Sequence, residues 1–252
     1  MNSQLKVFGG NNLPPNNWKS VFGGSAWTWS NARKQFYLHQ FTKEQPDLNY
    51  RNPKVVEEMS EVLNYYMSKG VAGFRLDAIN HMFETKNLPD EPRNEFITDP
   101  DSYEYFVHIH TKDLQETYDI VYDWRAQMDK FAKDNGLDDF VLMTEAYANT
   151  SFTMKYYASD DGTRKGAHMP FNFQLIYNSN RNSNANQIKS GIDEWLNNMP
   201  AGETADWVVG SHDHSRAASR STPDKVDIVN TLVMTLPGAS ITYYVTNMIN
   251  YL

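Results

Sequence analysis

The sequence predicts an α/β fold in which helices alternate with strands and cover a mainly parallel sheet. Stretches with apolar residues at helical spacing alternate along the chain with short apolar runs of strand length. One of these runs, 140–144, is apolar almost throughout, which is typical of a strand buried on both faces. At 252 residues, the chain is long enough to form one large α/β domain, such as a barrel, or two smaller domains.

The individual elements follow from local signals. The first 46 residues are rich in aromatic residues, Gly and Asn without steady periodicity, which favours irregular loops around one strand at 35–41. Asn52 and Pro53 are typical of a helix start, because the amide caps the first turn and proline fits its first position. A polar stretch at 84–103 indicates a long loop. The other expected elements are helices at 53–70, 102–135 with a break, 187–198 and 216–236 with a break near Pro223, and strands at 71–78, 140–144, 168–173, 207–210 and 239–244.

Three acidic residues end expected strands. Arg75 and Asp77 lie two residues apart on one strand that we expect to be buried, so both side chains share a face. The arginine favours the charged form of the aspartate and lowers its pKa, which suits a nucleophile. Glu145 and Asp213 end two later apolar runs. Because functional groups of parallel barrels gather at the carboxyl ends of the strands, we expect the three acids to converge, an arrangement that suits glycoside hydrolysis.

Composition excludes several classes of protein. Acidic residues number 31 against 23 basic ones, without a basic cluster, so nucleic acid binding is not expected. The absence of cysteine excludes disulfides and thiolate metal sites. The first twenty residues contain Gly and Pro where a signal peptide needs an apolar core. The apolar stretch 226–245 contains Asp227, Asn230 and Pro237, so we expect no membrane span and a soluble chain.

Four ordered blocks carry a resemblance to a known family. They are Gln45-Pro-Asp-Leu-Asn49, Gly73-Phe-Arg-Leu-Asp-Ala78, Thr144-Glu-Ala146 and His212-Asp213. In order and spacing they resemble the conserved blocks of the α-amylase superfamily, glycoside hydrolase family 13. The first block and the Tyr-Arg-Asn-Pro that follows it resemble the maltase and oligo-1,6-glucosidase branch, most closely the insect α-glucosidases.

This resemblance implies a fold and a mechanism. The fold would be a TIM (β/α)8 barrel of α-amylase type. The mechanism would be retaining, with Asp77 as nucleophile, Glu145 as general acid/base and Asp213 as the carboxylate that holds sugar hydroxyls. A general acid needs a raised pKa, to which desolvation of Glu145 by apolar neighbours such as Val141 would contribute. Arg75 and His212 would contact the substrate, and so would Arg216, for which capping of the following helix is the alternative.

The resemblance also implies a substrate and a location. The small Ala78 after the nucleophile favours α-1,4 linkages and sucrose, so we expect disaccharide or short oligosaccharide substrates such as maltose. We expect no cofactor and no metal, and the sequence does not indicate an oligomeric state. The resemblance to this branch implies that the protein is secreted or lies on the extracellular surface. The glycosylation sequon at Asn149 agrees with a glycoprotein.

The sequence departs from the family pattern in three places. An Asp-x-x-x-x-Asn-His block expected upstream is absent, Ser211 stands where the family has Asn, and residues after Tyr244 do not continue the family pattern. We therefore expect a partial barrel with strands 4 to 8 and without strands 1 to 3. The expected divisions are a remnant of the loop-rich inserted domain at 1–46, the partial barrel at 47–244 and a tail at 245–252. Expressed alone, such a chain would expose open sheet edges, so we expect poor solubility and no measurable glucosidase activity.

Alternative interpretations remain open. Arg75 and Asp77 could form a purely structural ion pair. His212, Asp213 and His214 could bind a metal together with His108 and His110, although the last two fall within an expected helix. A different functional class within the same family is a non-catalytic binding protein, such as the heavy-chain ectodomain of an amino acid transporter or a surface receptor.

Overall fold

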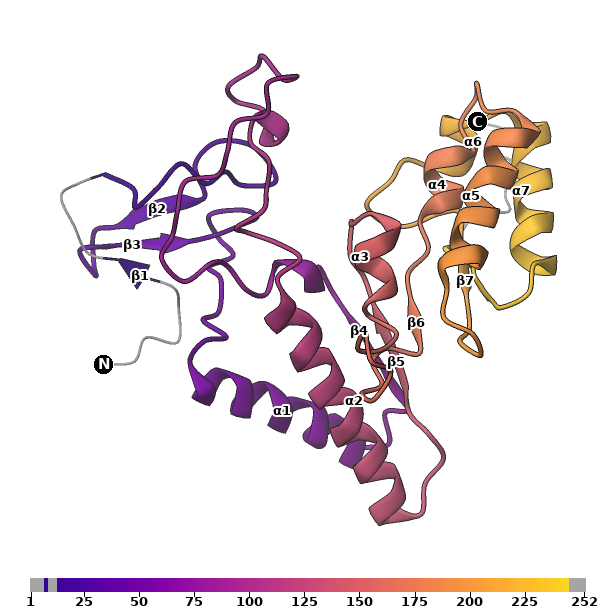
Figure 1. Cartoon of the computed structure of the whole chain (residues 1–252), viewed down its shortest axis with the longest axis horizontal. Coiled ribbons are helices and arrows are strands. Elements are labelled where there is room, and N and C mark those ends of the chain that lie inside the picture. Colours follow the sequence, from indigo (N-terminus) through magenta and orange to yellow (C-terminus); the bar gives the residue numbers. More distant parts are fainter. Residues whose placement is uncertain (1–6, 9–12, 245–252) are drawn as a thin grey trace.

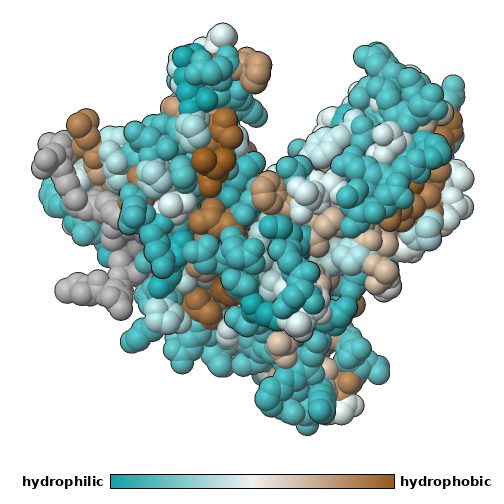
Figure 2. Space-filling model, in the orientation of Figure 1, coloured by the Kyte–Doolittle hydropathy of each residue, from teal (hydrophilic) through white to brown (hydrophobic). Residues whose placement is uncertain are grey.

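The computed structural model describes residues 7–8 and 13–244, so the expected tail at 245–252 lies outside the described residues. Figure 1 shows an antiparallel sheet on one side of the molecule, a group of short and long helices on the other, and a parallel sheet between them. In the space-filling view, an open notch separates the part with the antiparallel sheet from the part with the later helices (Figure 2).

The antiparallel sheet contains β1 (Val7–Phe8), β2 (Trp27–Ser30) and β3 (Gln35–Leu38), in the order β1-β3-β2. The strand predicted at 35–41 is confirmed but ends at Leu38, whereas β2 was not predicted because its Trp-Thr-Trp-Ser sequence lies in a stretch without periodicity. A small core of its own stabilises this sheet. Its buried members are Trp18, Ala26, Trp27, Phe36 and Leu38.

The long loop predicted at 84–103 packs against this first part of the chain. Asn17 and Glu91 exchange two hydrogen bonds, one from the Asn17 side chain to the Glu91 carbonyl (2.9 Å) and one from the Glu91 N–H to the Asn17 side chain (2.7 Å). The Trp18 indole donates to the Pro89 carbonyl at 2.8 Å. These contacts join segments more than 70 residues apart in the sequence.

Two long helices precede the first two strands of the central parallel sheet. Helix α1 (Pro53–Ser68) begins as predicted, with the Asn52 side chain accepting from the N–H of Lys54. Helix α2 (Gln115–Asn135) ends at Gly136, whose φ of 63° lies in the left-handed region that favours glycine. The two helices share one core with the parallel sheet. Its buried residues include Leu63, Met67, Ile79, Tyr118, Val121, Tyr122, Trp124, Met128 and Leu142.

The helix predicted over 102–135 begins thirteen residues later than expected, at Gln115. Only a single 3-10 turn, η2 (Tyr103–Tyr105), forms within 102–114. The buried Glu91 carboxylate explains the difference, because it accepts hydrogen bonds from the N–H groups of Ile109 and His110 and from the hydroxyl of Thr111. The loop backbone is thus satisfied by a distant side chain rather than by helical hydrogen bonds.

The central parallel sheet contains β4 (Gly73–Leu76), β5 (Val141–Thr144) and β6 (Met169–Pro170), in that order. The register pairs Leu76 with Thr144, so β4 and β5 end at the same level. A single 3-10 turn, η1 (Ile79–His81), follows β4. All three strands were predicted, with longer bounds than the structure shows.

The last third of the chain builds a second parallel pair with helices around it. Helices α3 (Thr150–Met154) and α4 (Gln174–Asn178) have five residues each and were not predicted. The break predicted near Pro223 is confirmed. The remaining elements are α5 (Ala185–Asn198), β7 (Asp206–Val208), α6 (Ala217–Arg220), α7 (Pro223–Thr235) and β8 (Ala239–Ile241), and β7 pairs with β8.

The five predicted parallel strands are confirmed, and in the described residues they form two sheets, β4-β5-β6 and β7-β8, as parts of a partial barrel. Strand β6 is only two residues long and ends in Pro170, which has no N–H to donate to a further strand. A side chain bridges the gap instead. The carboxylate of Asp206, at the start of β7, accepts from the N–H of Asn172 at 2.7 Å, and both residues are fully buried.

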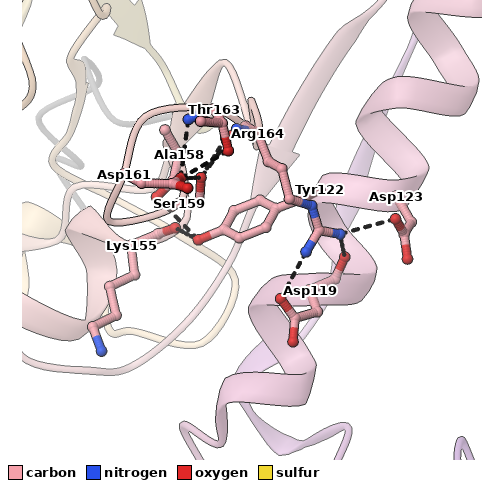
Figure 3. A network of polar contacts seen from close by, with 9 residues as sticks. All are labelled: Asp119, Tyr122, Asp123, Lys155, Ala158, Ser159, Asp161, Thr163 and Arg164. Atoms are coloured by element: carbon pink, nitrogen blue, oxygen red, sulfur yellow. Dashed lines mark hydrogen bonds and ion pairs between the residues drawn. The ribbon is translucent and has the colours of Figure 1, made fainter.

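A polar network connects α2 to the loop after α3 (Figure 3). The Arg164 guanidinium contacts the carboxylates of Asp119 (2.8 Å) and Asp123 (2.9 Å) and lies over the ring of Tyr122. The Asp161 carboxylate accepts from Ser159 and Thr163, and these hydrogen bonds lower its pKa to about 2. This network holds the segment before β6 against the helix that covers the central sheet.

Candidate active site

Arg75 brings the first two predicted acids together. One terminal nitrogen of its guanidinium pairs with Oδ1 of Asp77, and the other lies 3.6 Å from Oε1 of Glu145. Because Leu76 and Thr144 are partners in the sheet, the two acids directly follow paired strand ends. Asp77 and Glu145 therefore lie at the same, carboxyl end of the parallel sheet, as predicted from the sequence.

Glu145 is the buried member of this pair, with 3% of its surface exposed. Its Oε2 accepts from the N–H of Ala78 at 2.8 Å, and its main chain bonds to Leu76 and Ile79. Burial raises the pKa of Glu145, and the charges of Asp77 and Asp213 act in the same direction, whereas the Ala78 N–H and Arg75 oppose the shift. The buried Glu145 is thus suited to keep a proton that it can donate.

The apolar surroundings of Glu145 differ from the predicted ones. Val141, at the opposite end of β5, is 37% exposed, whereas Phe171 and Phe173 line the same cavity as the Glu145 carboxyl group. Ala78 adopts a φ of 43°, in the left-handed region that non-glycine residues rarely adopt. That turn directs the Ala78 N–H to Glu145.

The expectation that Arg75 and Asp77 lie on a buried strand was wrong. Their side chains are 31% and 72% exposed. Within the described residues, β4 pairs only with β5, so one edge and part of its surface have no neighbouring strand. An apolar sequence predicts burial only when other elements cover both sides of the strand.

Asp213 approaches the same end of the sheet from the loop after β7. The Tyr147 hydroxyl donates to its Oδ2 at 3.2 Å, and Nε2 of His212 lies 3.4 Å from its Oδ1. Ser211, at the position of the family asparagine, lies 2.9 Å from Nδ1 of His214, and its hydroxyl accepts from the Asp213 N–H at 3.3 Å. The serine hydroxyl therefore stabilises the local turn that carries Asp213.

A cavity of about 190 Å³ collects four of the predicted residues: Arg75, Glu145, His212 and Asp213. Asp77 does not line this cavity, but it contacts Arg75, which does. A larger cavity of about 840 Å³ adjoins it, between the loop at 94–114 and the segments after β5 and β6. The two cavities share an aromatic wall made of Tyr147, Phe171 and Phe173.

The three residues of this aromatic wall were not predicted from the sequence. Tyr147 follows Glu145 by two residues, and Phe171 and Phe173 follow the end of β6. Their position just after strands at the functional end of the sheet was the signal that could have found them. Aromatic residues are so common in protein cores that the sequence alone did not separate these three from the others.

Arg216 lies outside the smaller cavity. Its guanidinium donates to the carbonyl of Tyr244 at 2.8 Å and lies over the rings of Tyr243 and Tyr244. Arg216 is the N-cap residue of the following helix α6, as the alternative predicts, but its side chain makes no capping hydrogen bond.

The alternative metal site is not assembled in the described part of the chain. His108 and His110 lie in a loop rather than in the predicted helix, and the His108 ring stacks on Tyr103 at 3.6 Å. Residues 7–8 and 13–244 contain no group of three or more His, Cys, Asp or Glu side chains placed to hold a metal ion.

The comparison with protein families identifies the fold. The family model described as the catalytic domain of alpha amylase matches residues 2–249. The chain belongs to the α-amylase family. Its two parallel sheets are accordingly part of the TIM barrel of this family.

Two curated relatives and one solved structure show the degree of similarity. An α-glucosidase of Culex pipiens is 58% identical over 231 residues, and Maltase 1 of Drosophila virilis is 52% identical over 232 residues. Each alignment covers 92% of this chain but only 40% and 37% of the relatives, so the chain spans about two fifths of their length. The crystal structure of the α-glucosyl transfer enzyme XgtA is 28% identical, with a TM-score of 0.79, and the match covers 94% of this chain and 44% of XgtA.

Among the described residues, no helix combines the length and the apolar character needed to cross a membrane.

Proposed function

We propose that the protein is a maltase-like retaining α-glucosidase. The observation that carries this proposal is the position of one guanidinium, that of Arg75, between the carboxyl groups of Asp77 and Glu145. Retaining glycosidases need two carboxyl groups about 5 Å apart, one to attack and one to donate a proton. Two acids that contact the two terminal nitrogens of one arginine lie close to each other, which supports this arrangement.

The environments of the two acids support a different role for each. Asp77 is exposed and charge-paired, so it is available to attack the anomeric carbon. Glu145 is buried with a raised pKa, so it holds the proton that the leaving oxygen takes and afterwards acts as the base that activates water. Asp213, held by Tyr147, accepts hydrogen bonds from sugar hydroxyls. His212, Arg75 and Arg216 contribute further substrate contacts.

The substrate is proposed to be a short α-1,4-linked glucoside. Relatives at 43–58% identity carry the names α-glucosidase, maltase and salivary α-glucosidase. The small side chain of Ala78 leaves space beside Glu145, at a backbone φ of 43° where a β-branched residue would be strained. The salivary relatives also support secretion or an extracellular location, and Asn149, an exposed sequon residue, is a candidate for glycosylation there.

A non-catalytic role is the second candidate, because an amino acid transporter heavy chain from Homo sapiens is 40% identical over 239 residues. That relative is less similar than the α-glucosidases. The assembled Arg75, Asp77, Glu145 and Asp213 favour the enzyme, since a binding partner has no need of a buried proton donor beside a paired carboxylate.

Hydrolysis of a chromogenic aryl α-glucoside followed by proton NMR tests the proposal in the protein that carries this chain, because such a substrate releases glucose only from the cleaved glycosidic bond. We expect α-glucose to appear before it mutarotates to the β-anomer, because double displacement retains configuration. Asp77→Asn should lower kcat by roughly 10³-fold or more, the scale seen when a catalytic nucleophile is removed. Asp227→Asn, an exposed carboxylate on α7, serves as the control with unchanged turnover. Initial release of β-glucose, or full activity of Asp77→Asn, would contradict the mechanism.

A further inference from the structure

A row of aromatic rings connects the two groups of acids. The rings of Tyr147 and Phe173 stack with centroids 4.7 Å apart and planes 12° apart, and Phe171 stacks on Phe173 at 5.9 Å and 21°. The guanidinium of Arg75 lies 5.5 Å from the ring of Phe171. The order along this aromatic row is therefore Arg75, Phe171, Phe173 and Tyr147, and all four residues line the smaller cavity.

Each end of the aromatic row contacts a carboxylate group of the candidate site. At one end, Arg75 pairs with Asp77 and approaches Glu145. At the other end, the Tyr147 hydroxyl donates to Asp213. The three aromatic residues come from the segments after β5 and β6, whereas Asp213 follows β7, which belongs to the other parallel sheet. The bond from Tyr147 to Asp213 thus crosses a gap that no strand pairing spans in the described structure.

We propose that Tyr147 is a positioning residue whose hydroxyl holds the Asp213 carboxylate at the correct distance from Asp77 and Glu145, with the aromatic row as the rigid spacer. This inference rests on the proposed function, and it adds a residue that the sequence blocks do not include. Tyr147 acts through Asp213, which is the group expected to contact the sugar.

The chemistry of Tyr147 fits this role. Burial raises the pKa of its phenol, and the negative charges of Glu145 and Asp213 raise it further, so the hydroxyl stays protonated and donates to the carboxylate. A hydrogen bond to a charged group is stronger than one between neutral groups. The stacked ring also has little rotational freedom left to lose when the hydrogen bond forms.

The other two contacts of Asp213 do not fix its carboxylate relative to the sheet that carries Glu145. His212 lies 3.4 Å from Oδ1, but it is the preceding residue on the same loop and moves together with Asp213. Ser211 contacts the main-chain N–H of Asp213 and therefore fixes the turn rather than the carboxylate. Tyr147, from the loop after β5, ties Oδ2 to the sheet that carries Glu145.

Tyr147→Phe tests the inference because it removes the hydroxyl and keeps the ring in the aromatic row. We expect an unchanged melting temperature, roughly tenfold weaker binding of 1-deoxynojirimycin by calorimetry, and a similar fall in kcat/KM, the scale of one hydrogen bond to a charged group. Tyr65→Phe, an exposed tyrosine of α1, is the matched control and should bind like the wild type.

A double-mutant cycle separates positioning from general structural damage. If Tyr147 acts through Asp213, then Tyr147→Phe has no further effect on binding once Asp213→Ala is present, because alanine leaves no acceptor for the hydroxyl. Additive effects of the two substitutions, or wild-type binding by Tyr147→Phe, would overturn the inference. Should Tyr147→Phe fail to fold, Phe173→Leu provides the second test, since it breaks the stacking and must cause the same loss with the hydroxyl intact.

A different experimental result would show that the proposed function, and not the role of Tyr147, is wrong. A wild-type protein that neither cleaves maltose nor binds 1-deoxynojirimycin would contradict the glucosidase proposal. The positioning of Asp213 is then decided by a crystal structure of Tyr147→Phe. A displaced Asp213 carboxylate supports the inference, and a carboxylate in its wild-type place overturns it.

Discussion

At the scale of single residues, Asp77 and Glu145 show how surroundings decide chemistry. Both are carboxylic acids at the carboxyl ends of neighbouring strands, and both contact Arg75. The Asp77 side chain is 72% exposed, whereas Glu145 is 3% exposed and lines a cavity together with Phe171 and Phe173. Acids in different environments take different roles, so the exposed one is suited to attack and the buried one to carry a proton.

Glu145→Gln should abolish proton donation while keeping the shape of the side chain and an acceptor for the Ala78 N–H. We expect kcat to fall about 10²- to 10⁴-fold, the usual contribution of a general acid. In the wild type, activity should fall as pH rises through the raised pKa of Glu145, because the ionised form has no proton to donate. The variant should lack this alkaline fall, measured as kcat/KM against pH.

Glu58→Gln, on the exposed face of α1, is the control and should retain the wild-type profile. A Glu145→Gln protein with undiminished turnover would remove Glu145 from the acid/base role.

At the scale of elements, the turn before β8 depends on one glycine. Gly238 has a φ of 133°, and a Cβ added there would lie 2.3 Å from the Ala205 carbonyl oxygen. That carbonyl accepts from the N–H of Ala239, and the Trp207 indole donates to the Pro237 carbonyl, so the turn is bound closely to β7. The pairing of β7 with β8 therefore requires a residue without a side chain at this position.

Gly238→Ala should destabilise the protein by about 3 kcal/mol or more, because backbone strain and a clash with a main-chain oxygen act together. Gly202→Ala is the matched control. Its φ of 87° is also positive, but a Cβ there would meet nothing within 4 Å, so it should cost only about 1–2 kcal/mol. Urea unfolding measures both values. Equal losses would show that strain alone, and not the contact with Ala205, determines the cost.

At the scale of the whole molecule, Asp206 joins the two parallel sheets. Burial raises its pKa well above the usual value, and the single N–H of Asn172 opposes this shift only in part. A folded-state pKa above the unfolded one means that the folded protein binds the proton more tightly. Protonated Asp206 therefore adds to the free energy of unfolding. This contribution is fully present below the unfolded pKa of 3.8 and is lost as pH rises through the folded pKa.

Asp206→Asn should reduce this loss of stability on going from pH 4 to pH 8, since the amide is neutral and still has an oxygen for the Asn172 N–H. The free energy of unfolding, measured across this range, checks the expectation. Asp206→Ala should instead cost about 1–3 kcal/mol because the Asn172 N–H is left buried and unpaired. Asp227→Asn should keep the wild-type slope, and an identical slope in Asp206→Asn would refute the assignment.

Also at this scale, the predicted division at residue 46 stays a prediction. Residues of the antiparallel sheet form their own core, but the loop at 84–112 packs against them through Asn17 and Trp18. Residues from both sides of residue 46 thus contribute to this part of the molecule.

Local sequence signals were enough to predict the α-amylase family, the helix start at Asn52, the helix break near Pro223, and the acids that directly follow β4 and β5. These features follow from signals within a few residues, namely caps, apolar periodicity and ordered blocks. Only the tertiary structure decided that Glu145 is buried while Asp77 is exposed, that Glu91 holds a loop where a helix was expected, and that Tyr147 meets Asp213. Each of these outcomes depends on residues far apart in the chain, whose approach is set by packing and not by local pattern.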